Sequence, residues 1–305
     1  MIQTDANLFG RVITAMVTPF DDDLEVDFRA VERIVEHLLA SGTESIVVAG
    51  TTGESPTLED YEKKELLKVV KSAAKGRAKV VMGTGYNSTS KSIKASQEAE
   101  ALGADGLLVV APYYNKPSQD GLLAHFEAVA HATALPIILY NIPGRTGVNV
   151  NTDTLAELTR RCRTLHAVKD STGNVEQAAE LAGRAREDFR IYSGDDYLTL
   201  PFLSIGACGV VSVASHLAGT AIEEMCKCFF AGQLDQARKV HYQYLPLFKG
   251  LFTAPNPTCI KFALSQLGLC KPHLRLPLVP LAGSQKEAME ALLRQFRASA
   301  KLPTA

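Results

Sequence analysis

The chain has 305 residues, 46% hydrophobic and 21% charged, which is typical of a globular protein with one large domain or two smaller ones. Its 32 Lys and Arg residues nearly balance 33 Asp and Glu residues. The resulting net charge of −1 argues against nucleic acid or an anionic membrane as partner. No apolar run reaches the roughly 20 residues that span a bilayer, and residues 1–20 lack the pattern of a signal peptide. Six scattered cysteines predict free thiols, so we expect a cytoplasmic protein.

Short β-branched runs alternate with helical patterns from residue 12 to about residue 232. The runs are apolar at nearly every position rather than at alternate positions, which is typical of parallel strands covered on both faces. We expect strands at 12–20, 45–50, 79–85, 106–112, 136–142, 166–171, 190–195 and 209–215.

Amphipathic helical patterns fill the segments between these runs, beginning with 27–42, 57–76, 88–103 and 118–133. The second of these is expected to open at Thr57, with acidic residues in its first turn, and to stop at Gly76. After residue 232 the pattern is entirely helical. The helices expected there are 233–251, 256–268 and 284–299.

The alternation of strand and helix predicts an α/β fold, a closed (β/α)8 TIM barrel. The alternative is an open doubly wound sheet, which normally carries a glycine-rich fingerprint after its first strand. Here the first strand is followed by "TPFDDDLEVD", which contains no glycine, so the barrel is favoured. We therefore divide the chain into a barrel, residues 1–232, and a C-terminal helical extension, residues 233–305, that packs on it.

Polar side chains follow the expected strands at their C-terminal ends, where TIM-barrel enzymes carry their active sites. The segments are "GTTGES" (50–55), "PYYN" (112–115), "YNIPGRTG" (140–147), "KDS" (169–171) and "SGDD" (193–196). Asp195 and Asp196 could instead cap the helix that follows them.

Other members of this set also have structural explanations. Thr51 and Thr52 could cap the next helix, and Arg145 could pair with Asp153. Lys169 could be an ordinary lysine at a strand end whose ammonium reaches water or pairs with Asp170. The pair "CKC" at 226–228 has the wrong spacing for a zinc knuckle, so we expect no metal.

Together the strand-end residues suit carbon–carbon bond chemistry on an α-keto acid. A lysine held in a dry site is a nucleophile toward a carbonyl, because burial favours its neutral form. Threonine hydroxyls and the amides of a Gly-rich turn suit a carboxylate, and a tyrosine can relay protons. An arginine can clamp a second carboxylate. A phosphosugar aldolase is disfavoured, because the two aspartates after the seventh strand would repel phosphate.

The ordered set "GTTGES", "YYNKPSQDG", "YNIPGRTG", "KDS", "SGDD" and "GVVSV" resembles the pyruvate-dependent class I aldolase family, and "PNPTCIKFAL" (255–264) also fits. The resemblance extends from about residue 10 to 280. Arg145 favours the members that condense pyruvate with L-aspartate 4-semialdehyde to 4-hydroxy-tetrahydrodipicolinate, the entry step of diaminopimelate and lysine biosynthesis. N-acetylneuraminate lyases usually lack this arginine. The resemblance also implies a homotetramer of two tight dimers and no cofactor besides the covalent imine.

The resemblance implies a role for each strand-end residue. Lys169 forms the Schiff base with pyruvate. Tyr140, Thr51 and Tyr114 form a proton relay, to which Tyr114 comes from a neighbouring subunit. Thr52 binds the pyruvate carboxylate. The remaining substrate-binding residues are Arg145, Gly194 and Val211.

Family members that lysine inhibits carry a feedback site between subunits. This chain keeps three residues of that pocket, Ser55, Asn87 and Tyr113. Where sensitive members have two histidines and a glutamate, it has Asp60, Lys63 and Lys91. Two cationic side chains would repel a cationic ligand, so we expect the pocket to be non-functional for lysine.

Two other functions stay open from the sequence. A different pyruvate aldolase, such as a lyase for 4-hydroxy-2-oxoglutarate or a keto-deoxy sugar acid, would not need aspartate semialdehyde. A catalytically silent barrel would serve as a binding or assembly protein, with Lys169 an ordinary lysine. Borohydride reduction with pyruvate separates the two classes, because only an enzyme gains an adduct on Lys169.

Overall fold

The computed structural model describes residues 8–298, and its eight strands form a closed barrel in chain order. This confirms the expected TIM-barrel fold. The first seven residues of the predicted barrel segment and the last seven of the predicted extension lie outside the described residues. The strands are β1 (Val12–Ala15), β2 (Ser45–Val48), β3 (Lys79–Gly83), β4 (Gly106–Val110), β5 (Ile137–Asn141), β6 (Leu165–Asp170), β7 (Arg190–Ser193) and β8 (Gly209–Ser212).

Every expected strand is present, but the predicted ranges extend beyond the observed C-terminal ends. The largest excess is at β1, predicted to residue 20 and observed to Ala15. The reason is physical: the residues after a strand can stay apolar and buried, as Met16 and Val17 do after β1, while the chain leaves the regular strand and enters the loops of the barrel mouth. An apolar run therefore marks a strand well and its last residue poorly.

The chain forms two compact units, Met1–Ala78 with Ser212–Ala305, and Lys79–Val211. The predicted division at residue 232 between barrel and extension stays a prediction.

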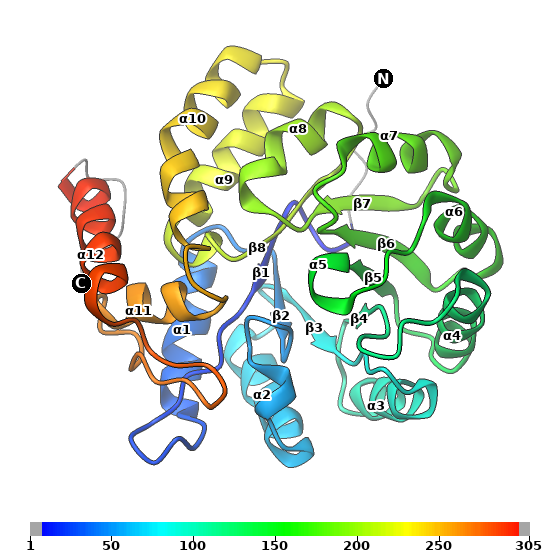
Figure 1. Ribbon diagram of the computed structural model, residues 1–305, viewed down its shortest axis with the longest axis horizontal. Coiled ribbons are helices and arrows are strands. Elements are labelled where there is room, and N and C mark those ends of the chain that lie inside the picture. Colours follow the sequence, from blue (N-terminus) through cyan, green and yellow to red (C-terminus); the bar gives the residue numbers. More distant parts are fainter. Residues whose placement is uncertain (1–7, 299–305) are drawn as a thin grey trace. The chain divides into compact units, whose positions relative to one another are not determined.

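The first unit contains β1, β2 and the helices α9 to α12, which follow the eighth strand. Its helices are α1 (Phe28–Ala40), η1 (Ser55–Thr57), α2 (Asp60–Ala74), α9 (Ser215–Phe230), α10 (Leu234–Gly250), α11 (Thr258–Ser265) and α12 (Gly283–Ala298). Helix α1 shows why these segments are helical: Asp27 caps its N-terminus by accepting from the Ala30 N–H at 2.9 Å, and its apolar face is buried. Helices α9 and α10 lie side by side (Figure 1).

Helix α2 begins at Asp60, three residues after the predicted opening at Thr57. Thr57 instead closes the short turn η1, where its Oγ1 donates to the Glu54 carbonyl at 3.0 Å. The actual N-cap is Glu59, whose N–H donates to the Glu62 carboxylate at 2.8 Å. Threonine is the more common cap, so the sequence alone favoured the wrong residue.

The second unit contains β3 to β7 and most of β8, with each adjacent strand pair parallel. Its helices are α3 (Thr89–Ala101), α4 (Gln119–His131), α5 (Pro143–Thr146), α6 (Thr152–Arg161), α7 (Val175–Arg184), η2 (Asp196–Leu198) and α8 (Thr199–Ser204). The register pairs Tyr140 with Lys169 and Lys169 with Tyr192, so these three residues stand in one row across β5, β6 and β7.

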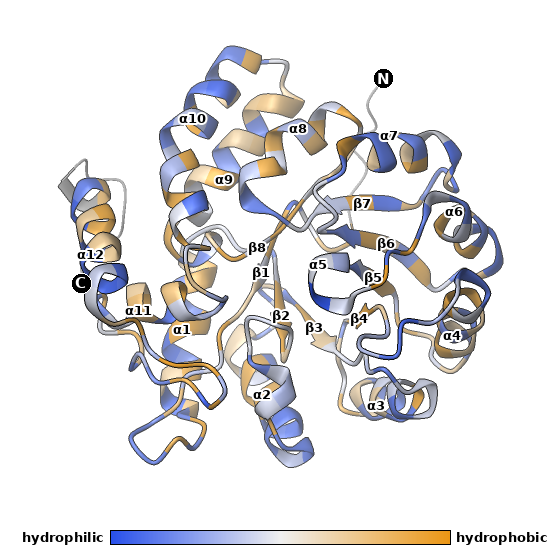
Figure 2. Cartoon of the chain, in the orientation of Figure 1, coloured by the Kyte–Doolittle hydropathy of each residue, from blue (hydrophilic) through white to orange (hydrophobic). Residues whose placement is uncertain are grey.

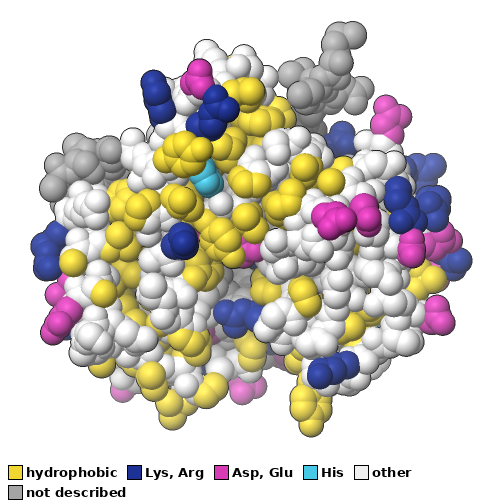
Figure 3. All heavy atoms as spheres, turned by 45° about the horizontal axis from the view of Figure 1, so that its top comes forward, with side chains coloured by type: hydrophobic (Ala, Val, Ile, Leu, Met, Phe, Trp, Pro, Cys, Tyr) yellow, Lys and Arg dark blue, Asp and Glu magenta, His cyan; other side chains and the backbone are white. Residues whose placement is uncertain are grey.

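Helices of both units carry hydrophobic and hydrophilic residues together, as Figure 2 shows for α4 and α10. The hydrophobic residues pack inward and the polar residues meet water. On the face drawn in Figure 3, Lys and Arg side chains are interspersed with Asp and Glu side chains. None of the described helices is both long and apolar enough to serve as a membrane-spanning segment.

Candidate active site

Lys169 lies next to the end of β6, and only 5% of its surface is exposed. The strand register places Tyr140 of β5 beside it, and the Lys169 Nζ lies 4.2 Å from the centroid of the Tyr140 ring. Tyr140 is buried as well. A lysine whose ammonium reached water would be far more exposed, so the structure contradicts the reading of Lys169 as a strand-end lysine that extends into solvent.

The start of the loop after β7 packs directly against the stem of Lys169. At Gly194, a Cβ atom would lie 1.9 Å from the Ser171 Oγ and 3.1 Å from the Lys169 Cε. The Gly194 N–H also donates to the Asp170 carbonyl at 2.6 Å. Only glycine allows this approach, so the backbone of Gly194 forms one wall around the lysine.

Two carboxylates lie near the lysine. The Asp170 Oδ1 accepts from the Thr172 N–H at 2.8 Å and from the Thr172 Oγ1 at 2.6 Å, while burial raises the pKa of Asp170. The pKa of Asp195 is raised to about 6, chiefly by burial; the charge of Lys169 lowers it, and Asp196 and Asp170 raise it, by smaller amounts. The Asp195 side chain makes no capping bond at the start of η2. Its carboxyl therefore belongs to the surroundings of the lysine.

Replacing Asp195 by Asn is expected to stabilise the fold more at pH 8 than at pH 5, by about 1 kcal/mol. The folded-state pKa of Asp195 is raised above the unfolded value. Between these two pKa values, the carboxyl of residue 195 is deprotonated in the unfolded chain but still largely protonated in the folded chain. Rising pH therefore favours the unfolded chain. Asparagine removes this loss. Urea unfolding at the two pH values measures the difference.

Asp188→Asn is the control of opposite sign, since Arg186 lowers the pKa of Asp188. That variant should lose stability at neutral pH. An Asp195→Asn variant with the same gain at both pH values would contradict the assignment.

The loops after β4 and β5 meet at a backbone contact. The Tyr114 N–H donates to the Thr146 carbonyl of α5 at 3.4 Å. Tyr114 has a left-handed backbone, with φ of 74°, and its side chain is 89% exposed. Arg145 of α5 is also exposed. The alternative pairing of Arg145 with Asp153 is wrong, because Asp153 pairs with Arg184 at 2.5 Å.

The loop "GTTGES" follows β2 in the first unit. Thr52 is 2% exposed, and its Oγ1 accepts from the Asn256 Nδ2 at 2.9 Å. The carbonyl of Thr51 accepts from the Glu54 N–H at 3.1 Å. The two threonines do not cap α2, whose N-cap is Glu59. They lie in a fixed loop at the mouth end of the strand.

Residues 8–296 match the dihydrodipicolinate synthetase family. The chain belongs to this family. It is 50% identical over 291 residues to 4-hydroxy-tetrahydrodipicolinate synthase 1 of Halalkalibacterium halodurans, an alignment that covers 94% of this chain and 97% of the relative. This confirms the expected function, 4-hydroxy-tetrahydrodipicolinate synthase activity at the first step of diaminopimelate and lysine biosynthesis, over a different aldolase or a silent barrel.

Solved structures of the dihydrodipicolinate synthetase family agree with this fold along nearly the whole chain. The enzyme from Cyanidioschyzon merolae with lysine bound has a TM-score of 0.93 and 45% identity, and covers 97% of this chain and 100% of that one. The chloride-inhibited enzyme from Acinetobacter baumannii, complexed with pyruvate, has a TM-score of 0.91 and 38% identity, and covers 96% and 100%.

Sequence reasoning gave no role to a buried charge pair behind the threonine loop of this synthetase-family chain. The Glu54 carboxylate meets the Lys261 ammonium at 2.5 Å, and both side chains are almost fully buried. The Glu54 Oε2 also accepts from the Arg275 N–H at 3.1 Å. The signal was available: Lys261 stands alone in the apolar run "CIKFAL", and Glu54 follows small neutral residues. Two such charges, buried far apart in sequence, require partners.

The expected lysine pocket of the family has members in both units. Ser55, Asp60 and Lys63 belong to the first unit, at η1 and the first turn of α2. Asn87, Lys91 and Tyr113 belong to the second, around the start of α3 and the loop after β4. In the second unit, the Asn115 Nδ2 donates to the Asn87 carbonyl at 2.9 Å, which ties these two loops together.

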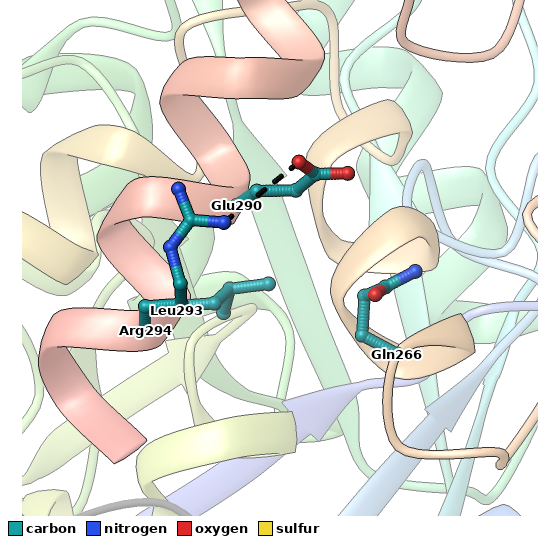
Figure 4. Close-up of a pocket in the computed structure, with 4 residues that line it drawn as sticks. All are labelled: Gln266, Glu290, Leu293 and Arg294. Atoms are coloured by element: carbon teal, nitrogen blue, oxygen red, sulfur yellow. Dashed lines mark ion pairs between the residues drawn. The ribbon is translucent and has the colours of Figure 1, made fainter. Parts of the chain in front are cut away.

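No group of three or more His, Cys, Asp or Glu side chains in residues 8–298 is arranged to hold a metal ion. A cavity of about 230 Å3 lies between the end of α11 and the face of α12 (Figure 4). Its two charged side chains belong to Glu290 and Arg294, which pair with each other at 4.0 Å, and Gln266 and Leu293 complete its lining. This cavity offers no nucleophile to a substrate.

Proposed function

We propose that this chain condenses pyruvate with L-aspartate 4-semialdehyde through an imine on Lys169. The buried position of the Lys169 amine beside Tyr140 carries the proposal. Such a site suits Schiff-base formation, because a lysine amine enclosed at a barrel mouth can attack the carbonyl of a bound keto acid. The pyruvate complex of the Acinetobacter baumannii relative supports pyruvate as the first substrate.

The chemistry follows from the two carbonyls. The Lys169 Nζ attacks C2 of pyruvate, and the carbonyl oxygen leaves as water, which gives the imine. Loss of a methyl proton gives an enamine, whose carbon attacks the aldehyde carbon of the second substrate while the aldehyde oxygen takes up a proton. The amino group of the semialdehyde then attacks the imine carbon, which closes the ring and releases Lys169.

Other residues of the site bind and move protons. Tyr140, Thr51 and Tyr114 relay protons, and the 89% exposure of Tyr114 supports its contribution to a second copy of the chain. Thr52 holds the pyruvate carboxylate. The other substrate contacts are Arg145, Gly194 and Val211. We infer a homotetramer, built as a dimer of dimers, with no cofactor besides the imine. The cytoplasmic location stays a prediction.

Purified protein given both substrates tests this function. We expect consumption of pyruvate that depends on the semialdehyde, and a single borohydride-reduced pyruvate adduct on Lys169, found by peptide mass spectrometry. Pyruvate released from a longer keto acid without the semialdehyde, or no adduct, would contradict the proposal.

Arg145→Ala should weaken use of the semialdehyde far more than use of pyruvate. The side chain is exposed on α5, and its guanidinium would bind the semialdehyde carboxylate through two parallel hydrogen bonds. We expect KM for the semialdehyde to rise by roughly ten- to a hundredfold. Arg145→Lys keeps the charge, so its KM for the semialdehyde should lie between the values of the unaltered chain and Arg145→Ala. Equal losses for both substrates would show that the clamp is misplaced.

Lysine should inhibit this chain weakly or not at all. Lys63 and Lys91 stand where sensitive members of the family have other residues, and their charges repel a cationic amino acid. An inhibition curve with lysine tests this. A midpoint at sub-millimolar lysine would refute it.

A further inference from the structure

We propose that Asn256 is a positioning residue that directs the hydroxyl proton of Thr52 toward the carboxylate of the keto acid. The inference rests on the proposed function, in which Thr52 binds that carboxylate. The observation is the contact of the Asn256 Nδ2 with the Thr52 Oγ1 at 2.9 Å, between residues 204 positions apart. Both side chains are buried, at 8% and 2% exposure, so water does not compete for this bond.

The direction follows from the donor and acceptor inventory. A threonine hydroxyl has one proton to donate and can accept through its lone pairs, whereas an amide N–H only donates. Because the Thr52 oxygen accepts from Asn256, the Thr52 proton is free to point elsewhere. A carboxylate only accepts, and it is the strongest acceptor that a keto acid offers. The Thr52 hydroxyl could otherwise either accept or donate a hydrogen bond. The bond from Asn256 thus leaves it to act as a donor toward the substrate.

The segment that carries Asn256 is fixed to the same loop at a second point. Lys261 lies five residues further on, in α11, and pairs with Glu54 two residues after Thr52. Gly53, the residue between Thr52 and Glu54, is also held: its carbonyl accepts from the Thr18 Oγ1 at 2.7 Å. The loop is therefore held on both sides of Gly53, and Asn256 acts on a hydroxyl whose backbone position is already set.

The test compares Asn256→Ala and Asn256→Asp by the pyruvate concentration that gives half-maximal borohydride-trapped adduct on Lys169. Alanine removes the donor, and we expect that concentration to rise about tenfold, with kcat changed less. Aspartate has nearly the same shape, but its carboxylate accepts the Thr52 proton and repels the substrate. We expect a larger rise for aspartate than for alanine. A purely structural role predicts the reverse order, because the isosteric residue would disturb packing less.

A double-mutant cycle with Thr52→Val shows whether Asn256 acts through Thr52. Once the Thr52 hydroxyl is gone, Asn256→Ala should raise the half-maximal concentration no further. A full additional rise would overturn the inference, as would a milder effect of aspartate than of alanine. If Asn256→Ala fails to fold, Asn256→Leu, which also removes the donor but keeps a side chain of similar size, takes its place in the cycle.

Thr18→Val is the matched control, since it loosens the same loop without touching the Thr52 hydroxyl. It should lower the melting temperature and leave the half-maximal pyruvate concentration nearly unchanged; a rise as large as that of Asn256→Ala would overturn the inference. The two proposals fail differently. Absence of adduct in the unaltered chain defeats the proposed function, whereas a normal adduct with unchanged Asn256 variants defeats only this inference.

Discussion

Lys169→Ala is expected to abolish turnover and to remove the borohydride-trapped pyruvate adduct. The amine is the nucleophile of every covalent step, and the described residues around it offer no second amine in the same row of β5, β6 and β7. Removal of a catalytic nucleophile costs roughly 10⁴-fold or more in kcat. A coupled assay measures the loss, and peptide mass spectrometry follows the adduct.

Lys79→Ala is the control for this variant. Lys79 is the exposed first residue of β3, so its loss removes the same charge from the same unit without touching the site. We expect normal turnover. A Lys169→Ala variant with more than one hundredth of the activity of the unaltered chain, or with an adduct on another lysine, would contradict the assignment of Lys169 as the nucleophile.

Tyr140→Phe is expected to lower kcat by roughly 10²–10⁴-fold, the usual contribution of a positioned proton-transfer group. The ring stays in its buried place 4.2 Å from the Lys169 Nζ, so packing around the lysine is retained. The half-saturating pyruvate concentration should therefore change little. Steady-state kinetics separates the two parameters.

Tyr197→Phe provides the comparison, since it deletes a phenol hydroxyl from η2, outside the proposed relay. Its kcat should stay within about threefold of the unaltered chain. A Tyr140→Phe variant with the same small effect would show that the hydroxyl does not move protons.

The fold could be predicted from sequence because apolar runs and amphipathic helices repeat in a fixed order. The limits came at the ends of elements. Thr57 looked like a helix cap, yet its hydroxyl donates to the Glu54 carbonyl within the preceding turn. A sequence pattern names good capping residues but does not say which hydrogen bond each one makes.

The candidate site was predicted in residue type more fully than in geometry. Lys169 and Tyr140 were expected together, and the strand register places them side by side. The partner of Thr52 could not be predicted, because Asn256 is 204 residues away and its segment "PNPTCIKFAL" does not say which side chain it contacts. The role of Asp195 was equally open: a carboxylate after a strand serves as a cap or faces a pocket according to its side-chain direction, which only the tertiary structure sets.

The Glu54–Lys261 pair limits how far this enzyme can be trimmed. A shortened version ending after α9 would keep all eight strands but discard the ammonium that neutralises Glu54. Stranding one member of a buried ion pair costs about 3–5 kcal/mol, a large part of the stability of an ordinary domain. Engineers seeking a minimal scaffold would therefore have to redesign residue 54 as an uncharged side chain before cutting the tail.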